Sequence, residues 1–106
     1  MAKNEVITLI QEFLKRLLKE GIPVEKAILY GSYARGEEND ESDIDVMVVS
    51  EIFDRNDDRM VGKTWRIGSS VDARIEPYTV GRNRFLNDRF SPLIQIVKNE
   101  GLEIRV

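Results

Sequence analysis

The stretch that decides the fold is GSYARGEENDESDIDVMVVS, residues 31–50, in which a glycine–serine pair precedes two aspartates and an apolar run. The segment before it, KAILY at residues 26–30, is also apolar, so two short buried strands are expected on either side of a polar connection. A glycine followed by serine at the end of a strand predicts a turn into one or two helical turns. The stretch therefore predicts a strand, a turn, a short helix and a second strand.

The remaining segments predict a small domain of mixed type. Apolar residues at helical spacing predict a helix over residues 5–20, which Gly21 ends. Residues 51–63 follow no clear pattern and are expected to form an exposed loop or an irregular helix. The later elements expected are one or two strands within residues 64–78 ending at Pro77, a turn, a helix over 91–100 and a closing strand over 102–106. We therefore expect an α/β (α+β) fold, a small mixed β-sheet flanked by helices, in a single domain spanning residues 1–106.

Composition limits the chemistry that the chain can perform. None of its 106 residues is a histidine or a cysteine, which excludes disulfides, zinc–thiolate sites and histidine-based nucleophilic catalysis. A net charge of −3 argues against general nucleic-acid binding, which needs a basic surface. No apolar run is long enough for a membrane span or a secretion signal, so we expect a soluble cytoplasmic protein.

Asp43 and Asp45 are candidate metal ligands. Residues two apart on a strand project from the same face, so both carboxylates point one way and Ile44 points the other. Two adjacent acids repel one another unless a cation lies between them, and Mg²⁺ binds one or two protein carboxylates together with water and phosphate oxygens. A solvated pair at the start of a strand is the alternative that this spacing leaves open.

Gly31 and Ser32 are candidate phosphate ligands. The glycine lets backbone amides approach an anion closely, and the serine hydroxyl adds a donor. Arg35, one turn later, has a planar guanidinium suited to a phosphate oxygen. Alone the pair is an ordinary turn, but ten residues separate it from Asp43. A turn after one strand would then face the start of its neighbour, the arrangement expected of a nucleoside triphosphate site served by Mg²⁺.

The motifs GSYARG and SDIDVMVV closely resemble those of the minimal nucleotidyltransferases, small members of the polymerase-β-like superfamily. The resemblance covers most of the chain and is most specific between Gly31 and Val49. It implies that the glycine–serine pair holds the triphosphate of ATP and that the two aspartates bind catalytic Mg²⁺, with Mn²⁺ as an alternative. It also implies a polymerase-β-like core without the helical acceptor domain of larger relatives.

The resemblance further implies a third carboxylate on a later strand, and two residues compete for that place. In SVDARIEPY, residues 70–78, Asp72 and Glu76 each lie two residues from Arg74, so all three would share one strand face. We favour Asp72 because the family's later-strand motif begins with its acid, whereas Pro77 would end the strand beside Glu76. The third carboxylate is expected to act as a base or as a further metal ligand.

The reaction implied by this resemblance is transfer of AMP from ATP to a hydroxyl group, with two-metal catalysis and release of pyrophosphate. Minimal nucleotidyltransferases commonly serve as antitoxins of helical HEPN-type toxins, so the implied acceptor is a tyrosine of such a partner. A domain of this size would need a partner or a second copy of itself, a homo-oligomer, to complete its acceptor site. The alternative is a non-catalytic binding module that neutralises a partner by contact.

Two further groups of residues are each open to two interpretations. Aromatic residues near the motifs suit either adenine stacking or core packing, and Trp65 suits either a partner anchor or the core. The aromatic residues near the motifs are Tyr30, Tyr33 and Phe53. A basic cluster of Arg82, Arg84 and Arg89 suits either a solvated surface or contact with an acidic or RNA-bearing partner.

Overall fold

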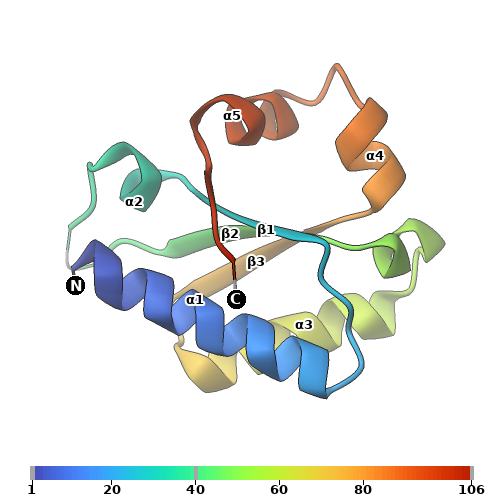
Figure 1. Cartoon of the computed structure of the whole chain (residues 1–106), viewed down its shortest axis with the longest axis horizontal. Coiled ribbons are helices and arrows are strands. Elements are labelled where there is room, and N and C mark those ends of the chain that lie inside the picture. Colours follow the sequence, from blue (N-terminus) through green and yellow to red (C-terminus); the bar gives the residue numbers. More distant parts are fainter. Residues whose placement is uncertain (1, 40, 106) are drawn as a thin grey trace.

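A four-stranded mixed sheet lies at the centre of the chain, in the order β3-β2-β1-β4 (Figure 1). The computed structural model describes residues 2–39 and 41–105. Strand β1 (Lys26–Tyr30) pairs antiparallel with β2 (Ile44–Val49) on one side and with β4 (Leu102–Glu103) on the other. Strand β3 (Ile75–Val80) pairs parallel with β2. The predicted α/β fold with a small mixed sheet is confirmed.

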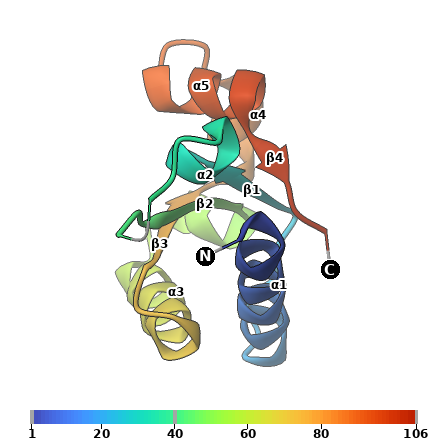
Figure 2. The same ribbon diagram turned by 90° about the vertical axis from the view of Figure 1, so that its left-hand side faces the viewer.

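Helices cover both faces of this sheet (Figure 2). The helical elements are α1 (Lys3–Lys19), α2 (Ser32–Arg35), the 3₁₀-helix η1 (Glu51–Arg55), α3 (Asp58–Val71), α4 (Arg82–Asn87) and α5 (Pro92–Glu100). Helices α1 and α3 lie side by side on one face, whereas α2, α4 and α5 lie on the other. Within the described ranges, no helix is both long and apolar enough to span a bilayer.

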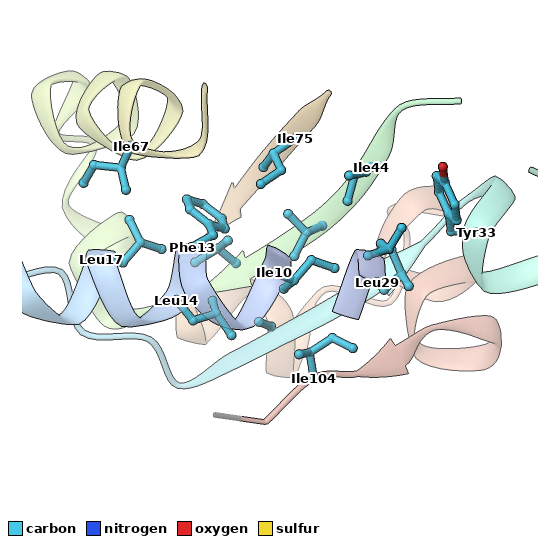
Figure 3. Packing of buried hydrophobic residues seen from close by; sticks show 14 of the residues in the cluster. Ile10, Phe13, Leu14, Leu17, Leu29, Tyr33, Ile44, Ile67, Ile75 and Ile104 are labelled. Carbon is cyan, nitrogen blue, oxygen red and sulfur yellow. The ribbon is translucent and has the colours of Figure 1, made fainter. Parts of the chain in front are cut away.

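The larger core lies between the sheet and the layer formed by α1 and α3 (Figure 3). One face of α1 contributes the buried residues Val6, Ile10, Phe13, Leu14 and Leu17. They repeat at helical spacing, and full burial of each such side chain contributes about 1.5–3 kcal/mol. The strands add their alternate side chains, among them Leu29, Ile44 and Ile75, as a two-residue period requires.

A smaller core lies on the opposite face of the sheet, under α4 and α5. The sheet supplies Ile28, Met47, Val49 and Val80, and the two helices add Phe85, Ile94 and Val97. Because side chains alternate along each strand, Tyr30, Asp45 and Glu76 must point to this same face. Tyr30 packs against the small core, and the carboxylates of Asp45 and Glu76 are left for a site.

Helix α3 corrects the sequence prediction for residues 51–78. The patternless segment and the first expected strand instead form η1 and the 14-residue α3. Asp57 caps the helix by accepting the Arg59 N–H, and Thr64 and Ile67 form its buried side. Gly68 is also buried, and a methyl group there would lie 3.1 Å from Ile75. The helix therefore packs close to the sheet at Gly68. A glycine at this buried position makes the helical spacing of apolar residues harder to recognise in the sequence.

We expected this strand to end at Pro77, but β3 continues to Val80. The carbonyls of Arg74 and Val80 accept the N–H groups of Ile44 and Ser50 in β2. The strand's even-numbered residues therefore direct their backbone groups at β2, and its odd-numbered residues direct theirs outward. Because β3 is an edge strand and Pro77 faces outward, the missing N–H breaks no bond within the sheet.

Two differences affect the C-terminal part of the chain. The expected turn before the last helix contains a second helix, α4, whose buried Phe85 packs in the small core. The helix expected over 91–100 is confirmed as α5, with the Ser91 hydroxyl accepting the Ile94 N–H at its start. The expected closing strand is limited to the two residues of β4, and Val106 lies outside the described residues.

Candidate active site

Three carboxylates gather where β2 and β3 begin, on the face of the sheet that carries α2. Asp45 lies directly opposite Glu76 in the parallel pairing of β2 with β3. Asp43 precedes Asp45 by two residues, which places it on the same side, and it raises the pKa of Glu76. Asp43 is exposed, whereas Asp45 and Glu76 are half-buried. The predicted Asp43–Asp45 pair therefore has a third acidic neighbour from the adjacent strand.

Burial and neighbouring carboxylates raise the pKa values of two acids in this cluster, Asp45 and Glu76. Burial and the Asp43 carboxylate raise the pKa of Asp45, and the Arg35 guanidinium opposes this shift. Burial, Asp43 and Asp45 together raise the pKa of Glu76. Negative charge is thus concentrated in a partly desolvated place, where a cation or a captured proton would relieve the repulsion. This is the electrostatic condition that favours a divalent metal or a general base.

Gly31 lies directly against the acidic cluster. It follows β1, has φ +75° and ψ −149°, and begins α2 with its carbonyl accepting the Ala34 and Arg35 N–H groups. A Cβ atom at this position would lie 2.4 Å from Oδ2 of Asp45, so only glycine fits. The turn that was predicted to bind phosphate and the aspartate that was predicted to bind metal are therefore in contact.

Arg35 is a cation at the edge of the same site. Its side chain is exposed and lies 3.1 Å from a carboxylate oxygen of Glu37. Its charge also acts on Asp45, whose pKa it lowers. An exposed ion pair of this kind contributes little to stability, so the guanidinium can exchange its carboxylate partner for a phosphate oxygen at small cost.

Asp72 is not brought to the acidic cluster. It caps the C-terminus of α3 and precedes β3, so the expectation that it shares a strand face with Glu76 is wrong. Its Oδ1 accepts the backbone N–H of Arg74 at 2.8 Å, and its Oδ2 accepts Nη2 of the same arginine at 3.0 Å. The Arg74 guanidinium lowers the pKa of Asp72, which is the opposite of the shift at Glu76.

Three comparisons with known proteins bear on this site. The profile of a family described as "Nucleotidyltransferase domain" matches residues 7–100. The chain belongs to the nucleotidyltransferase domain family. Two relatives from Methanocaldococcus jannaschii are named "Putative protein adenylyltransferase": one is 52% identical over 42 residues and the other 38% identical over 69 residues. These matches cover 40% and 63% of this chain, and 39% and 69% of the relatives.

Two relatives match over less than half of their own length, so the activity of the whole relative is not established for this chain by the match. A third relative of the same name and organism is 44% identical over 48 residues, and the chain spans less than half the length of this relative and of the first, 46% and 39%. A crystal structure from Sulfolobus solfataricus, titled a "putative nucleotidyltransferase", has the same fold with a TM-score of 0.62. Its identity is 22%, and the superposition covers 95% of this chain and 80% of that one. The fold of the nucleotidyltransferase domain is therefore shared over nearly the whole chain.

The acidic cluster fits a divalent metal by the chemistry of its donors. Within residues 2–39 and 41–105, no three acidic side chains already stand in an arrangement that could hold a metal ion. Mg²⁺ needs fewer, because it binds one or two carboxylates and keeps water and phosphate oxygens in its remaining positions. Asp43 and Asp45 meet that need with oxygen donors alone, and Mn²⁺ accepts the same donors.

Two tyrosines near the nucleotidyltransferase motifs have different surroundings. Tyr33 is fully buried at the end of the larger core, near Leu29 and Ile44 (Figure 3), and its hydroxyl has no hydrogen-bond partner in the described part of the chain. Tyr33 is thus a core residue and cannot stack on a base. Tyr30 is half-buried and lies opposite Asp45, and burial together with Asp45 raises its pKa to about 12. It remains a neutral phenol at physiological pH.

The sequence analysis favoured Asp72 over Glu76 as the third carboxylate, but Glu76 is the one that lies beside Asp45. A signal for it exists in the register: when β3 starts at Ile75, its second residue falls opposite Asp45. That register depends on the length of the connection through η1 and α3, which the local sequence pattern did not show. Whether Glu76 or Asp72 acts in catalysis stays a prediction, and the positions of their side chains favour Glu76.

Proposed function

We propose that the chain is an active nucleotidyltransferase that transfers AMP from ATP to a hydroxyl group of a protein. The contact between Gly31 and Asp45 carries this proposal, because it joins a backbone turn suited to phosphate with a carboxylate suited to metal. The names of the relatives from Methanocaldococcus jannaschii support a protein as acceptor. The resemblance to minimal nucleotidyltransferases makes a tyrosine of a HEPN-type toxin the first candidate, in the cytoplasm.

In this proposal the turn and Arg35 position the nucleotide. The backbone at Gly31 and Ser32 approaches the triphosphate, and the serine hydroxyl adds a donor. The exposed guanidinium of Arg35 leaves Glu37 and binds a phosphate oxygen. Fixing the phosphates in one orientation supplies much of the rate acceleration in phosphoryl-type transfer.

Asp43 and Asp45 hold Mg²⁺ in this proposal, either one ion or two. The bound metal supplies charge neutralisation on the phosphates and lowers the pKa of the attacking hydroxyl. The repulsion that raises the pKa of Asp45 in the metal-free chain disappears when the cation binds. The cation therefore favours the ionised form of the Asp45 carboxylate.

Glu76 acts as the base. Burial is the largest cause of its raised pKa and does not depend on the charges that the cation neutralises, so its carboxylate is a better proton acceptor than that of an ordinary glutamate. The acceptor oxygen forms a bond to the α-phosphorus of ATP, the bond from that phosphorus to the bridging oxygen breaks, and pyrophosphate leaves. The hydroxyl proton passes to the carboxylate of Glu76. The products are an acceptor carrying AMP, pyrophosphate and one proton.

The test is label transfer from ATP in a lysate of the source cells with Mg²⁺. Label at the α-phosphate should appear on a discrete protein, and label at the γ-phosphate should not. The double variant Asp43→Asn/Asp45→Asn should lose the transfer and should also lose the rise in Tm that Mg²⁺ and ATP give the wild type. A partner that binds wild type and double variant equally, with no transfer by either, would instead favour the non-catalytic binding module.

A further inference from the structure

Exposed apolar side chains occur along the segment from the start of α4 to the end of α5, residues 82–100. Phe90 is 93% exposed, Leu86 on α4 is 60% exposed, and Ile96 on α5 is 42% exposed. Arg84 and Arg89 lie in the same segment and are exposed too. We call these five residues the α4–α5 surface. Aromatic residues and arginine are the residues most enriched at the energetic centres of protein–protein interfaces.

Phe90 is held in place although its ring is exposed. The Asp88 carboxylate accepts the N–H groups of Phe90 and Ser91, each at 2.9 Å, and also lies 3.3 Å from Nε of Arg84. The Gln95 side chain donates to the Asp88 carbonyl at 2.8 Å. Hydrogen bonds from Phe90, Ser91 and Gln95 to Asp88 therefore hold the backbone between α4 and α5 in place. Binding through such a preorganised segment loses little backbone entropy.

The α4–α5 surface belongs to the same side of the molecule as the acidic cluster. Helices α4 and α5 cover the face of the sheet that carries Asp45 and Glu76 (Figures 1 and 2). Tyr78 follows Glu76 by two residues on β3, and its hydroxyl raises the pKa of the Arg84 guanidinium. One residue of the surface thus interacts with a strand residue two positions from the proposed base. A protein bound on this surface would lie on the side where the acceptor hydroxyl must enter.

The charge of the α4–α5 surface favours a different protein over a second copy of the chain as its partner. Arg89 forms no ion pair within the part of the chain that the structure describes, and its neighbour Phe90 carries no charge. A two-fold dimer through the α4–α5 surface would place the Arg89 side chains of both copies in one interface, and these like charges are unfavourable because Asp88 already pairs with Arg84. An apolar patch bordered by carboxylates matches the surface. RNA fits less well, because the chain has a net charge of −3 and RNA binding needs an extended basic surface.

We propose that the α4–α5 surface docks the protein that accepts AMP, through an apolar patch bordered by acidic residues on that protein. The proposal rests on the function proposed above and adds the place where the acceptor binds. Phe90 and Leu86 supply the apolar contact, and Arg89 pairs with a carboxylate. The docked protein then presents its hydroxyl to the acidic cluster. These residues position the acceptor and take no part in the chemistry.

The experiment measures the initial rate of α-label transfer from ATP as a function of lysate protein concentration. Phe90→Ala and Arg89→Glu should each raise the half-saturating concentration by about tenfold or more, with the rate at saturation within about twofold of wild type. Trp65→Ala and Arg66→Glu are matched controls, because both residues are exposed on α3 at the opposite face of the sheet. The controls should change the half-saturating concentration by less than about twofold.

Each variant is first checked by the rise in Tm that Mg²⁺ and ATP produce, which reports a folded and intact nucleotide site without any acceptor. If Phe90→Ala and Arg89→Glu pass this check and transfer like their controls, docking on this surface is refuted while the proposed function stands. If the wild type labels nothing, the proposed function fails and the docking proposal fails with it. A labelled product that ribonuclease destroys would also overturn the proposal, because the acceptor would then be RNA.

Discussion

Replacing Gly31 by alanine tests the contact on which the candidate site depends. The added Cβ atom would lie 2.4 Å from Oδ2 and 3.3 Å from Cγ of Asp45. The backbone at φ +75° and ψ −149° is also close to a region that essentially only glycine occupies. We expect both effects to destabilise the folded chain, one through backbone strain and the other through overlap with the carboxylate.

The two effects have separate magnitudes. Backbone strain in a sparsely populated region costs of order 1–3 kcal/mol. Displacing the half-buried Asp45 carboxylate costs about 1–3 kcal/mol more. The total of about 2–6 kcal/mol corresponds to a Tm lower by roughly 10 °C or more in a domain of this size. Gly36→Ala is the matched control, since Gly36 has φ +71° and nothing within 4 Å of its Cβ position, so it should cost only about 1 kcal/mol.

Urea unfolding of a double-mutant cycle separates the strain from the overlap. In an Asp45→Ala background only the Cβ atom of residue 45 remains near, at 3.5 Å, which is ordinary contact. The cost of Gly31→Ala should therefore fall by about 1–3 kcal/mol in that background, while the cost of Gly36→Ala should not change. Equal costs for the two glycine substitutions, with no coupling to Asp45, would refute the contact between turn and carboxylate.

Further predictions concern the ionisable groups of the site. Burial and a neighbouring carboxylate raise the Asp45 pKa, so the folded chain loses stability as the pH rises through that value. Asp45→Asn should therefore raise the metal-free Tm at pH 7, and the gain should shrink in acid. Arg74 lowers the Asp72 pKa, so that pair stabilises above the ordinary aspartate pKa and is lost as the pH falls through the lowered one. Asp72→Asn should cost about 1 kcal/mol in urea unfolding at pH 7 and leave α-label transfer within about twofold. Glu76→Gln should slow the same transfer by about 100-fold or more, and equal losses in both variants would contradict the assignment of the base. In an absorbance titration, Tyr30→Phe should remove the phenol that ionises at about pH 12 and leave the others unchanged.

Much of the site was predictable because its residues are close in sequence. Strands β1 and β2 are short apolar runs, and Gly31 marks the end of the first. The connection between them is short enough that a hairpin-like return was the natural expectation, and it places Gly31 against Asp45. Local pattern and spacing were therefore sufficient for half of the site.

The other half depends on pairing between distant segments. Glu76 reaches the site only because β3 aligns with β2 in one particular parallel register, after a crossover through η1 and α3. A parallel pair is joined by a long crossover and not by a tight turn, so its register could not be read from a short loop between the strands. Helix α3 was missed because small residues, Gly68 among them, take places where an apolar residue would have shown the helical period. Without the helix, the choice of Asp72 over Glu76 followed from a family motif and from the expectation that Pro77 ends the strand beside Glu76.

The outward position of Pro77 determines how this chain can associate with others. On the outer edge of β3 the N–H of Ile75 already bonds to the Asp72 carbonyl, and Pro77 has no N–H, which leaves Thr79 as the remaining odd-numbered donor. At the opposite edge β4 has only two residues. Neither edge presents the row of donors and acceptors that another chain needs to extend the sheet. The fold is thereby protected from edge-to-edge aggregation, and a partner must recognise its side chains.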